Sequence, residues 1–252
     1  MRDVAKDNNG NSTSNSLVDN KINTKTAKLT LNGIEYLKLE ENEMGSFVEA
    51  RVKKELIKKQ LTSELQQLNQ NAESQLKALK HSDTLLWWLN NQNTKNLKKD
   101  ALVRIAMLSV VAPKESFNTT PLDELLLKLN TVKSSLLIQI KSNNINEKSA
   151  SLLSDKFSSE KMATTRTYNK YTTHYLSLIS EHRKNIVGDA YISTLITEIK
   201  ITNKKGKIIS SNEIISSGNS VTGYKMANEG ASRHFAQQID DDGLWKSLGI
   251  NQ

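Results

Sequence analysis

Glycine and proline, the two residues that most often interrupt helices, are almost absent from the middle of this chain. Between Gly45 and Gly188 there is no further glycine, and the only prolines are Pro113 and Pro121. Leucine and isoleucine are frequent and regularly spaced, which argues against general disorder. The sequence therefore predicts a mainly α fold, a helical bundle with one long helix and two small β-hairpins, with an α+β fold as the alternative.

The long helix is predicted over residues 47–80. Apolar residues recur there every three or four positions, while lysine, glutamate and glutamine fill the other face. Because the apolar stripe follows a period near 3.6 rather than a strict 3.5, a bundle helix is favoured over a coiled-coil arm. The stripe comprises Val48, Val52, Leu56, Leu61, Leu65, Leu68, Ala72, Leu76 and Leu79.

Three segments are expected along the chain. Residues 1–26 are rich in asparagine, serine, aspartate and lysine, which is typical of a disordered N-terminal tail. Residues 27–186 are predicted to form a hairpin and the helical bundle. Residues 187–252 are predicted to form a C-terminal β-hairpin and a helix that pack on the bundle.

Local signals place several elements within these segments. The dipeptide Asn32-Gly33 favours a type I′ turn, so that strand 28–31 would pair with strand 34–39. Two helices follow the long one. The first starts near Thr94 and stops before Pro113, and the second starts at Thr120-Pro121, where threonine is expected to cap the helix and proline suits its first turn.

The C-terminal segment changes texture after Gly188. Alternating β-branched residues predict a second hairpin, in which 191–202 pairs with 207–216. Residues 190–200 also fit a helical period, so a helix there stays open as the alternative. A final helix is expected over 225–240.

Five aromatic residues are the candidates for a partner interface. Trp87 and Trp88 are adjacent in an apolar segment, which favours burial at the centre of the bundle over exposure at a partner surface. Tyr168, Tyr171 and Tyr175 share one face of a helical region predicted across 149–184, and their spacing favours a packing stripe over a ligand-binding site.

No catalytic constellation is visible, and we expect neither an enzyme nor a bound cofactor or metal. None of the four histidines lies in a zinc-binding pattern, and no glycine-rich phosphate loop or GxSxG elbow occurs. The acidic run Asp240 to Gly243 lacks the ligand spacing of an EF-hand, and a solvated helix end is the favoured interpretation. The chain has no cysteine, which excludes disulfides and thiolate chemistry.

A family resemblance supplies a more specific hypothesis. The stretch "LLWWLNNQNTKNLKKDALVRIAMLSVV", followed by "TTPLDELLLKL", resembles the helical component of bacterial GTPase-associated conflict systems. The resemblance implies a non-catalytic helical adaptor or assembly subunit that works beside an NTPase in antiviral defence. The positions that carry it are Trp87, Trp88, Ala101, Ala106, Leu125 and Leu126.

The expected partner is therefore a protein, an NTPase or a second copy of the chain. A net charge of +8 makes a nucleic-acid-binding protein one alternative, although the lysines are scattered along the chain. No stretch approaches the roughly 18 apolar residues that a membrane helix needs, so no membrane span is expected. The absence of cysteine and of an apolar N-terminal leader predicts a cytoplasmic protein. An envelope α+β binding protein whose signal has been removed is the other alternative.

Overall fold

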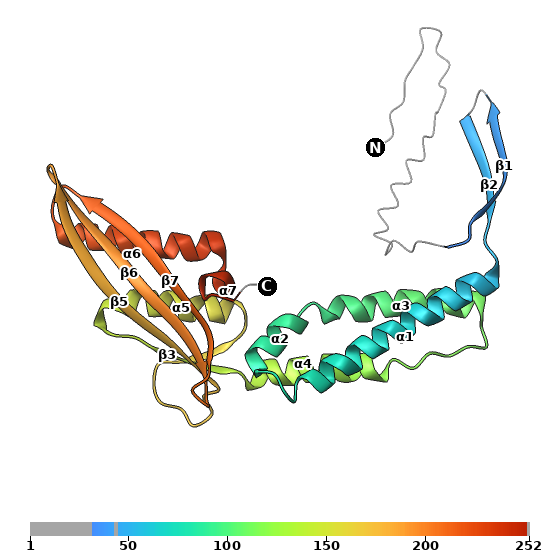
Figure 1. The fold of residues 1–252 in the computed structure, drawn as a ribbon, viewed down its shortest axis with the longest axis horizontal. Coiled ribbons are helices and arrows are strands. Elements are labelled where there is room, and N and C mark those ends of the chain that lie inside the picture. The colour runs from blue at the N-terminus through green and yellow to red at the C-terminus, as the bar shows by residue number, and fades with distance from the viewer. Residues whose placement is uncertain (1–31, 43–44, 251–252) are drawn as a thin grey trace, which may run out of the picture. The chain divides into compact units, whose positions relative to one another are not determined.

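The computed structural model describes residues 32–42 and 45–250, and the chain divides into two compact units, Met1–Lys53 and Lys54–Gln252 (Figure 1). The helices, all in the second unit, are α1 (Lys54–Ala78), α2 (Thr84–Asn91), α3 (Thr94–Val111), α4 (Thr120–Ser135), η1 (the 3₁₀ helix Asn144–Asn146), α5 (Glu147–Ser159), α6 (Tyr224–Asp242) and α7 (Leu244–Ser247). The strands are β1 (Glu35–Asn42), β2 (Gly45–Arg51), β3 (Leu137–Lys141), β4 (Ala163–Thr165), β5 (His174–Val187), β6 (Ala190–Asn203) and β7 (Ile208–Ser220).

The first unit contains a hairpin that is shifted along the sequence from the predicted one. Strands β1 and β2 pair antiparallel, with Leu39 opposite Val48. The predicted strand 34–39 overlaps β1, whereas the predicted strand 28–31 lies outside the described residues. The long helix begins only at Lys54, because Val48, the first residue of the apolar stripe, is β-branched and suits a strand as well as a helix.

Four helices of the second unit pack together. Helices α1, α3 and α4 contact one another, and α2 contacts α4. Leu61 and Leu65 of α1 and Leu125 of α4 are completely buried, as the apolar stripes predict. Helix α3 begins at Thr94 and ends before Pro113, which confirms its predicted limits.

The strands of the second unit form one mixed sheet in the order β4-β3-β5-β6-β7. Strand β3 runs parallel to β4 and β5, whereas β5, β6 and β7 are successively antiparallel. Helices α5 and α6 contact each other and cover one face of this sheet (Figure 1). The prediction of a mainly α bundle is therefore wrong, and the fold is α+β.

The error arises between residues 149 and 184, where the sequence predicts helix. Helix α5 ends at Ser159, and strands β4 and β5 follow. In β5 the buried residues Leu176 and Leu178 alternate with more exposed neighbours, which is the period of a strand. Residues 190–203 form strand β6, which pairs antiparallel with β5 and with β7. The helical alternative for 190–200 is therefore wrong, and the predicted second hairpin is confirmed. The expected segment boundary at 187 falls at the end of β5, inside the sheet.

Helix α6 lies directly against β7. A Cβ atom added to Gly218 of β7 would lie 2.3 Å from the carbonyl oxygen of Ala227 and 2.3 Å from the amide nitrogen of Ala231, both in α6. The corresponding helix residue, Gly230, would place its Cβ 3.1 Å from the Cα of Gly218. Two glycines therefore allow backbone-to-backbone contact, which fixes α6 on the sheet.

Candidate binding surface on the open face of the sheet

The two faces of the sheet differ in what covers them. Successive strand residues point to opposite faces, and on one face Leu178, Ile199 and Ile201 are buried beneath the helices. The alternate residues of β5, β6 and β7 form the other face, which we name the open face. Its central residues are Tyr175, Ser177, Ile179, Glu181, Arg183, Ile192, Thr194, Ile196, Glu198, Lys200, Ser211, Glu213, Ile215 and Ser217.

A row of three isoleucines crosses the open face. Ile196 of β6 lies directly opposite Ile215 of β7, and Ile179 of β5 lies opposite Glu198, two residues along from Ile196. Residues placed diagonally at this offset are within reach of one another. Ile179 is 58% exposed and Ile215 is 52% exposed. The row is therefore an apolar strip that the described part of the chain leaves in contact with water.

Carboxylates flank this strip. Glu198 and Glu213 lie directly opposite each other on neighbouring strands, an arrangement of like charges that is destabilising. Nζ of Lys200 lies 2.9 Å from Oε1 of Glu198, and Nη2 of Arg183 lies 2.7 Å from Oε1 of Glu181. Glu213 has no ion pair within the described part of the chain. The charge that remains uncompensated beside the isoleucines is negative.

A buried Asp–His pair lies at one end of the sheet. The Nε2 atom of His174 is 2.9 Å from Oδ1 of Asp83, and the amide of Asn203 donates to Oδ2 of Asp83 at 3.2 Å. Asp83 also caps α2 by accepting from the backbone N–H of Leu85 and Leu86. Both side chains are buried, so the pair joins the start of α2 to the ends of β5 and β6.

The environment of Asp83 favours its charged form. Burial raises the pKa of this carboxyl, but the hydrogen bond and the charge of His174 and the hydrogen bonds from Asn203 and Leu85 together lower the pKa below its ordinary value. Sequence reasoning does not find the pair, because Asp83 and His174 are 91 residues apart and share no local spacing. The hydrogen bonds of both groups serve to hold two parts of the fold together.

Trp87 and Trp88, two of the candidates for a partner interface, lie in the interior of the second unit. Trp87 is 2% exposed and donates from Nε1 to the carbonyl oxygen of Gln75 at 2.7 Å. Trp88 is 5% exposed and its ring lies 6.2 Å from that of Trp245 of α7, while Nζ of Lys133 lies 5.0 Å from its centroid. These contacts agree with the packing interpretation favoured from the sequence.

The three tyrosines do not share a helix face. Tyr168 and Tyr171 lie in the connection between β4 and β5 and are 82% and 69% exposed. Tyr175 lies on β5 at the open face, with Nζ of Lys141 at 4.4 Å from its ring centroid. A partner-binding role for these tyrosines stays a prediction, and Tyr175 is the one that adjoins the isoleucine row through its strand.

The acidic run at the end of α6 is engaged in ion pairs. Asp240 pairs with Lys156 of α5, and Asp242 pairs with Lys246 of α7 at 2.5 Å. Within residues 32–42 and 45–250, no group of three or more His, Cys, Asp or Glu side chains could hold a metal ion.

The structural likenesses of this chain to known proteins are distant. No protein-family model matches the chain, and no curated protein matches its sequence. The solved structure of a minor lipoprotein from Acinetobacter baumannii is 11% identical, with a TM-score of 0.36, over 46% of this chain and 96% of that one. Lipoprotein GNA1162 from Neisseria meningitidis is 12% identical, with a TM-score of 0.28, over 43% of this chain and 99% of that one.

These results correct the hypothesis of a cytoplasmic helical adaptor in a bacterial defence system. The hypothesis requires a helical bundle, whereas the chain has a five-stranded sheet with helices on one face. Both of the solved structures reported above carry the name lipoprotein, in contrast to the cytoplasmic localisation expected from the sequence. None of the helices that the structure describes is long and apolar enough to cross a membrane.

Proposed function

We propose that this chain is a non-catalytic α+β binding protein of the bacterial cell envelope, and that the open face of its sheet binds a cationic, partly apolar segment of a partner protein. The exposed isoleucine row carries the proposal. Ile179 and Ile215 stay more than half exposed beside Ile196, although the opposite face of the same strands is closely packed. A cluster of exposed apolar side chains on a protein surface is typical of an interaction site.

The energy available from the row is sufficient for recognition. Full burial of an isoleucine side chain stabilises by about 1.5–3 kcal/mol, so covering Ile179 and Ile215, which are about half exposed, together with the less exposed Ile196 contributes roughly 2–3 kcal/mol. That free energy corresponds to about two orders of magnitude in Kd. A cation placed beside Glu213 would add to it, because this carboxylate faces Glu198 and has no ion pair among the described residues.

The same charges decide between partners. A second copy that presented its own open face would bring Glu198 and Glu213 against the same carboxylates, which is unfavourable. Phosphate groups of a nucleic acid would be repelled at this surface for the same reason. A segment in which lysine or arginine alternates with aliphatic residues complements both the isoleucines and the acids.

Two further observations support the remaining parts of the proposal. Among the hypotheses drawn from the sequence, the envelope alternative is the one that calls for an α+β fold, and the sheet agrees with it. The most deeply buried pair of ionisable side chains described, Asp83 and His174, is used in capping α2 and joining it to the sheet. A non-catalytic role is consistent with that structural use.

Site-specific photocrosslinking tests the surface. A photoreactive residue replacing Thr194, which lies on the open face, should form an adduct with one envelope protein in growing cells. The same residue replacing Leu127, a 69% exposed position on α4, serves as the control and should form no such adduct. The adduct at position 194 should disappear in Ile215→Lys, and binding of the purified partner should weaken at least about tenfold, which is 1.4 kcal/mol.

Several outcomes would contradict the proposal. Equal adducts at positions 194 and 127, an adduct that survives Ile215→Lys, or none at either position would exclude the open face as the binding surface. An adduct with a second copy at position 194 would replace the partner by self-association. For localisation, fractionation of the source cells should find the full-length protein with the envelope, and recovery only in the cytosol would refute that part.

A further inference from the structure

Exposed lysines gather at the end of the sheet where β5 begins and β6 ends (Figure 1). One lies in the connection between β4 and β5, and the others lie in the turn between β6 and β7. None of them makes an ion pair within the described part of the chain. Together with three exposed aromatic or apolar neighbours they form a surface that we name the basic end. Its members are Lys170, Lys204, Lys205, Lys207, Tyr168, Tyr171 and Ile208.

Hydrogen bonds hold the two connections of the basic end together. The backbone N–H of Lys204 donates to the carbonyl oxygen of Thr173 at 3.0 Å, and its Nζ donates to the carbonyl oxygen of Lys170 at 3.3 Å. Within the turn, Oδ1 of Asn203 accepts from the backbone N–H of Lys205 at 3.0 Å. The lysines are therefore presented from backbone that is already positioned, which lowers the entropic cost of binding.

The positive charge of the basic end is not compensated. Residues 161–174 and 199–212 contain no aspartate or glutamate. Asp83 contacts this end of the sheet, but its carboxylate is buried and bound by His174. Glu198, farther along β6, is paired with a lysine of its own strand. The surface therefore favours an anionic partner.

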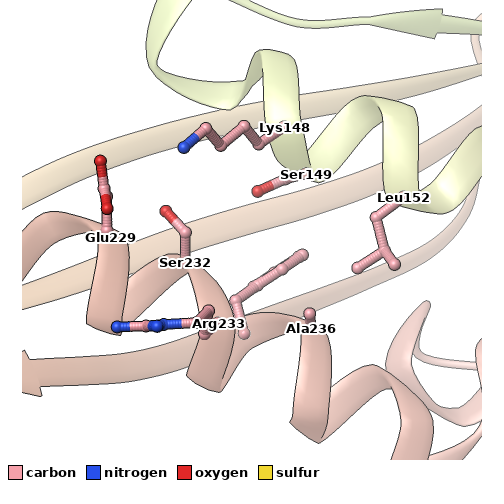
Figure 2. Close-up of a pocket in the computed structure, with 8 residues that line it drawn as sticks. Lys148, Ser149, Leu152, Glu229, Ser232, Arg233 and Ala236 are labelled. Carbon is pink, nitrogen blue, oxygen red and sulfur yellow. The ribbon is translucent and has the colours of Figure 1, made fainter.

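The charged side chains of α5 and α6 are arranged differently. Figure 2 shows the groove between these helices, with Lys148 beside Glu229 and the guanidinium group of Arg233 directed away from Lys148. Opposite charges are neighbours there, and the two cations do not converge. Charge of a single sign gathers at the basic end and not in this groove.

Aromatic and apolar side chains accompany the lysines. Tyr168 and Tyr171 are both mostly exposed, and Ile208, the first residue of β7, is 57% exposed. Tyrosine is enriched at membrane–water interfaces, because its ring is apolar and its hydroxyl is polar. Lysine suits the same place, since its long apolar stem can lie along the boundary while the ammonium group stays among the headgroups.

The same residues suit a nucleic acid less well. Single-stranded nucleic acids stack their bases on open aromatic rings, often with help from arginine. Nζ of Lys170 lies 5.0 Å from the centroid of the Tyr171 ring, so one face of that ring is covered. Arg166, the arginine of this connection, already donates to Ser142 at 2.9 Å and to Glu147 at 2.8 Å. A membrane surface requires neither an open ring face nor a free arginine.

We propose that the basic end docks on the anionic headgroups of a phospholipid membrane. The lysines lie near the phosphates, and Tyr168 and Ile208 lie at the boundary with the acyl chains. Each lysine near an anionic membrane surface strengthens binding about fivefold, so the four together contribute roughly 500-fold. This contact is peripheral and uses other residues than the isoleucine row, so it does not depend on the proposed function.

Cosedimentation of the full chain with vesicles of phosphatidylglycerol and phosphatidylethanolamine at low salt tests the docking. The variant Lys204→Gln/Lys205→Gln/Lys207→Gln should bind roughly 100-fold more weakly. The matched control removes the same charge at three exposed lysines elsewhere in the second unit that have no ion pair among the described residues, and it should weaken binding less than about fivefold. Its substitutions are Lys59→Gln, Lys114→Gln and Lys128→Gln.

A second variant separates a membrane from a soluble polyanion. Tyr168→Ser/Ile208→Ser should weaken binding to the vesicles at least about fivefold, because burial of these side chains at the boundary is lost. Binding to a single-stranded oligonucleotide and to polyglutamate, which offer no acyl layer, should be weaker than binding to the vesicles and unchanged by this variant. Thermal unfolding of each variant should match that of the wild type, since all the substituted side chains are exposed.

Several results would overturn the docking surface. They are equal binding to vesicles of phosphatidylcholine, equal losses in the two triple variants, no cosedimentation at low salt, or wild-type binding by Tyr168→Ser/Ile208→Ser. An oligonucleotide or polyglutamate that binds at least as tightly as the vesicles would replace the membrane by that partner. None of these results changes the expected adduct at position 194, so the open face stands or fails separately.

Discussion

Replacing Asp83 by alanine tests how strongly the buried Asp83–His174 pair joins α2 to the sheet. The substitution removes the N-cap of α2, which costs about 1 kcal/mol. It also leaves the Nε2 group of His174, whose side chain is 1% exposed, without its acceptor, and it removes one acceptor from Asn203. A buried donor without a partner costs about 1–3 kcal/mol, so the expected loss for Asp83→Ala is about 2–4 kcal/mol in the free energy of unfolding.

Urea unfolding of the full chain, followed by tryptophan fluorescence, measures this loss. Asp123→Ala is the matched control, since Asp123 is an exposed aspartate in the first turn of α4 that accepts from Nζ of Lys98 at 2.6 Å and from the hydroxyl of Thr119 at 3.0 Å. That exposed pair should contribute less than about 1 kcal/mol. If Asp83→Ala lowers the free energy of unfolding by no more than Asp123→Ala does, the Asp83–His174 pair does not join α2 to the sheet and the reasoning fails.

Two further predictions concern the same unit. The pKa of Asp83 is lowered in the folded chain, so its contribution is complete above its ordinary value of 3.8 and is lost as the pH falls through the lower folded pKa. The difference in unfolding free energy between the wild type and Asp83→Asn should therefore be constant from about pH 5 to 7 and narrow below about pH 4, as urea titrations at each pH would measure; a difference that stays constant down to pH 2 would contradict this. Gly218→Ala should destabilise by about 3 kcal/mol or more in thermal unfolding, because the new methyl group would lie 2.3 Å from backbone atoms of α6, and a change below about 1 kcal/mol would show that α6 can move away without cost.

Helices with local punctuation were the most predictable part of the fold. Helix α3 begins and ends where Thr94 and Pro113 indicate, and α6 closely follows the expected 225–240. Such signals lie within a few residues of the element that they limit. Strand β3, in contrast, has only five residues, and it owes its place to parallel pairing with β4 and β5, whose residues lie far along the chain. The local spacing of apolar residues in β3 does not predict that pairing.

The candidate site was only half visible in the sequence. Strand β6 carries apolar residues on both faces, with Leu195 and Ile199 toward the helices and Ile192 and Ile196 on the open face. This two-sided pattern also fits a helical period, which is why residues 190–200 allow either interpretation from the sequence. Which face remains open depends on where α5 and α6 pack, and that placement depends on long-range contacts such as the one at Gly218.

Strand β7 lies at the edge of the sheet, and side chains of α6 protect that edge. Edge strands of a sheet are liable to pair with other chains, and proteins usually protect them. Here the backbone N–H of Ser217 donates to Nδ1 of His234 at 3.1 Å, and the amide of Gln238 donates to the carbonyl oxygen of Ile215 at 3.2 Å. Both protecting side chains belong to α6, the same helix that covers the inner face of the sheet.

Side chains of α6 therefore form hydrogen bonds with backbone groups at the edge of β7. Ile215 of the same strand is nevertheless 52% exposed on the open face. A fold that had simply failed to cover its sheet would be expected to leave the edge unprotected as well. Protection of the edge suppresses non-specific strand pairing, and the recognition that remains is through side chains of the face. This selectivity favours a partner that reads the isoleucines and Glu213 over one that adds a strand to the sheet.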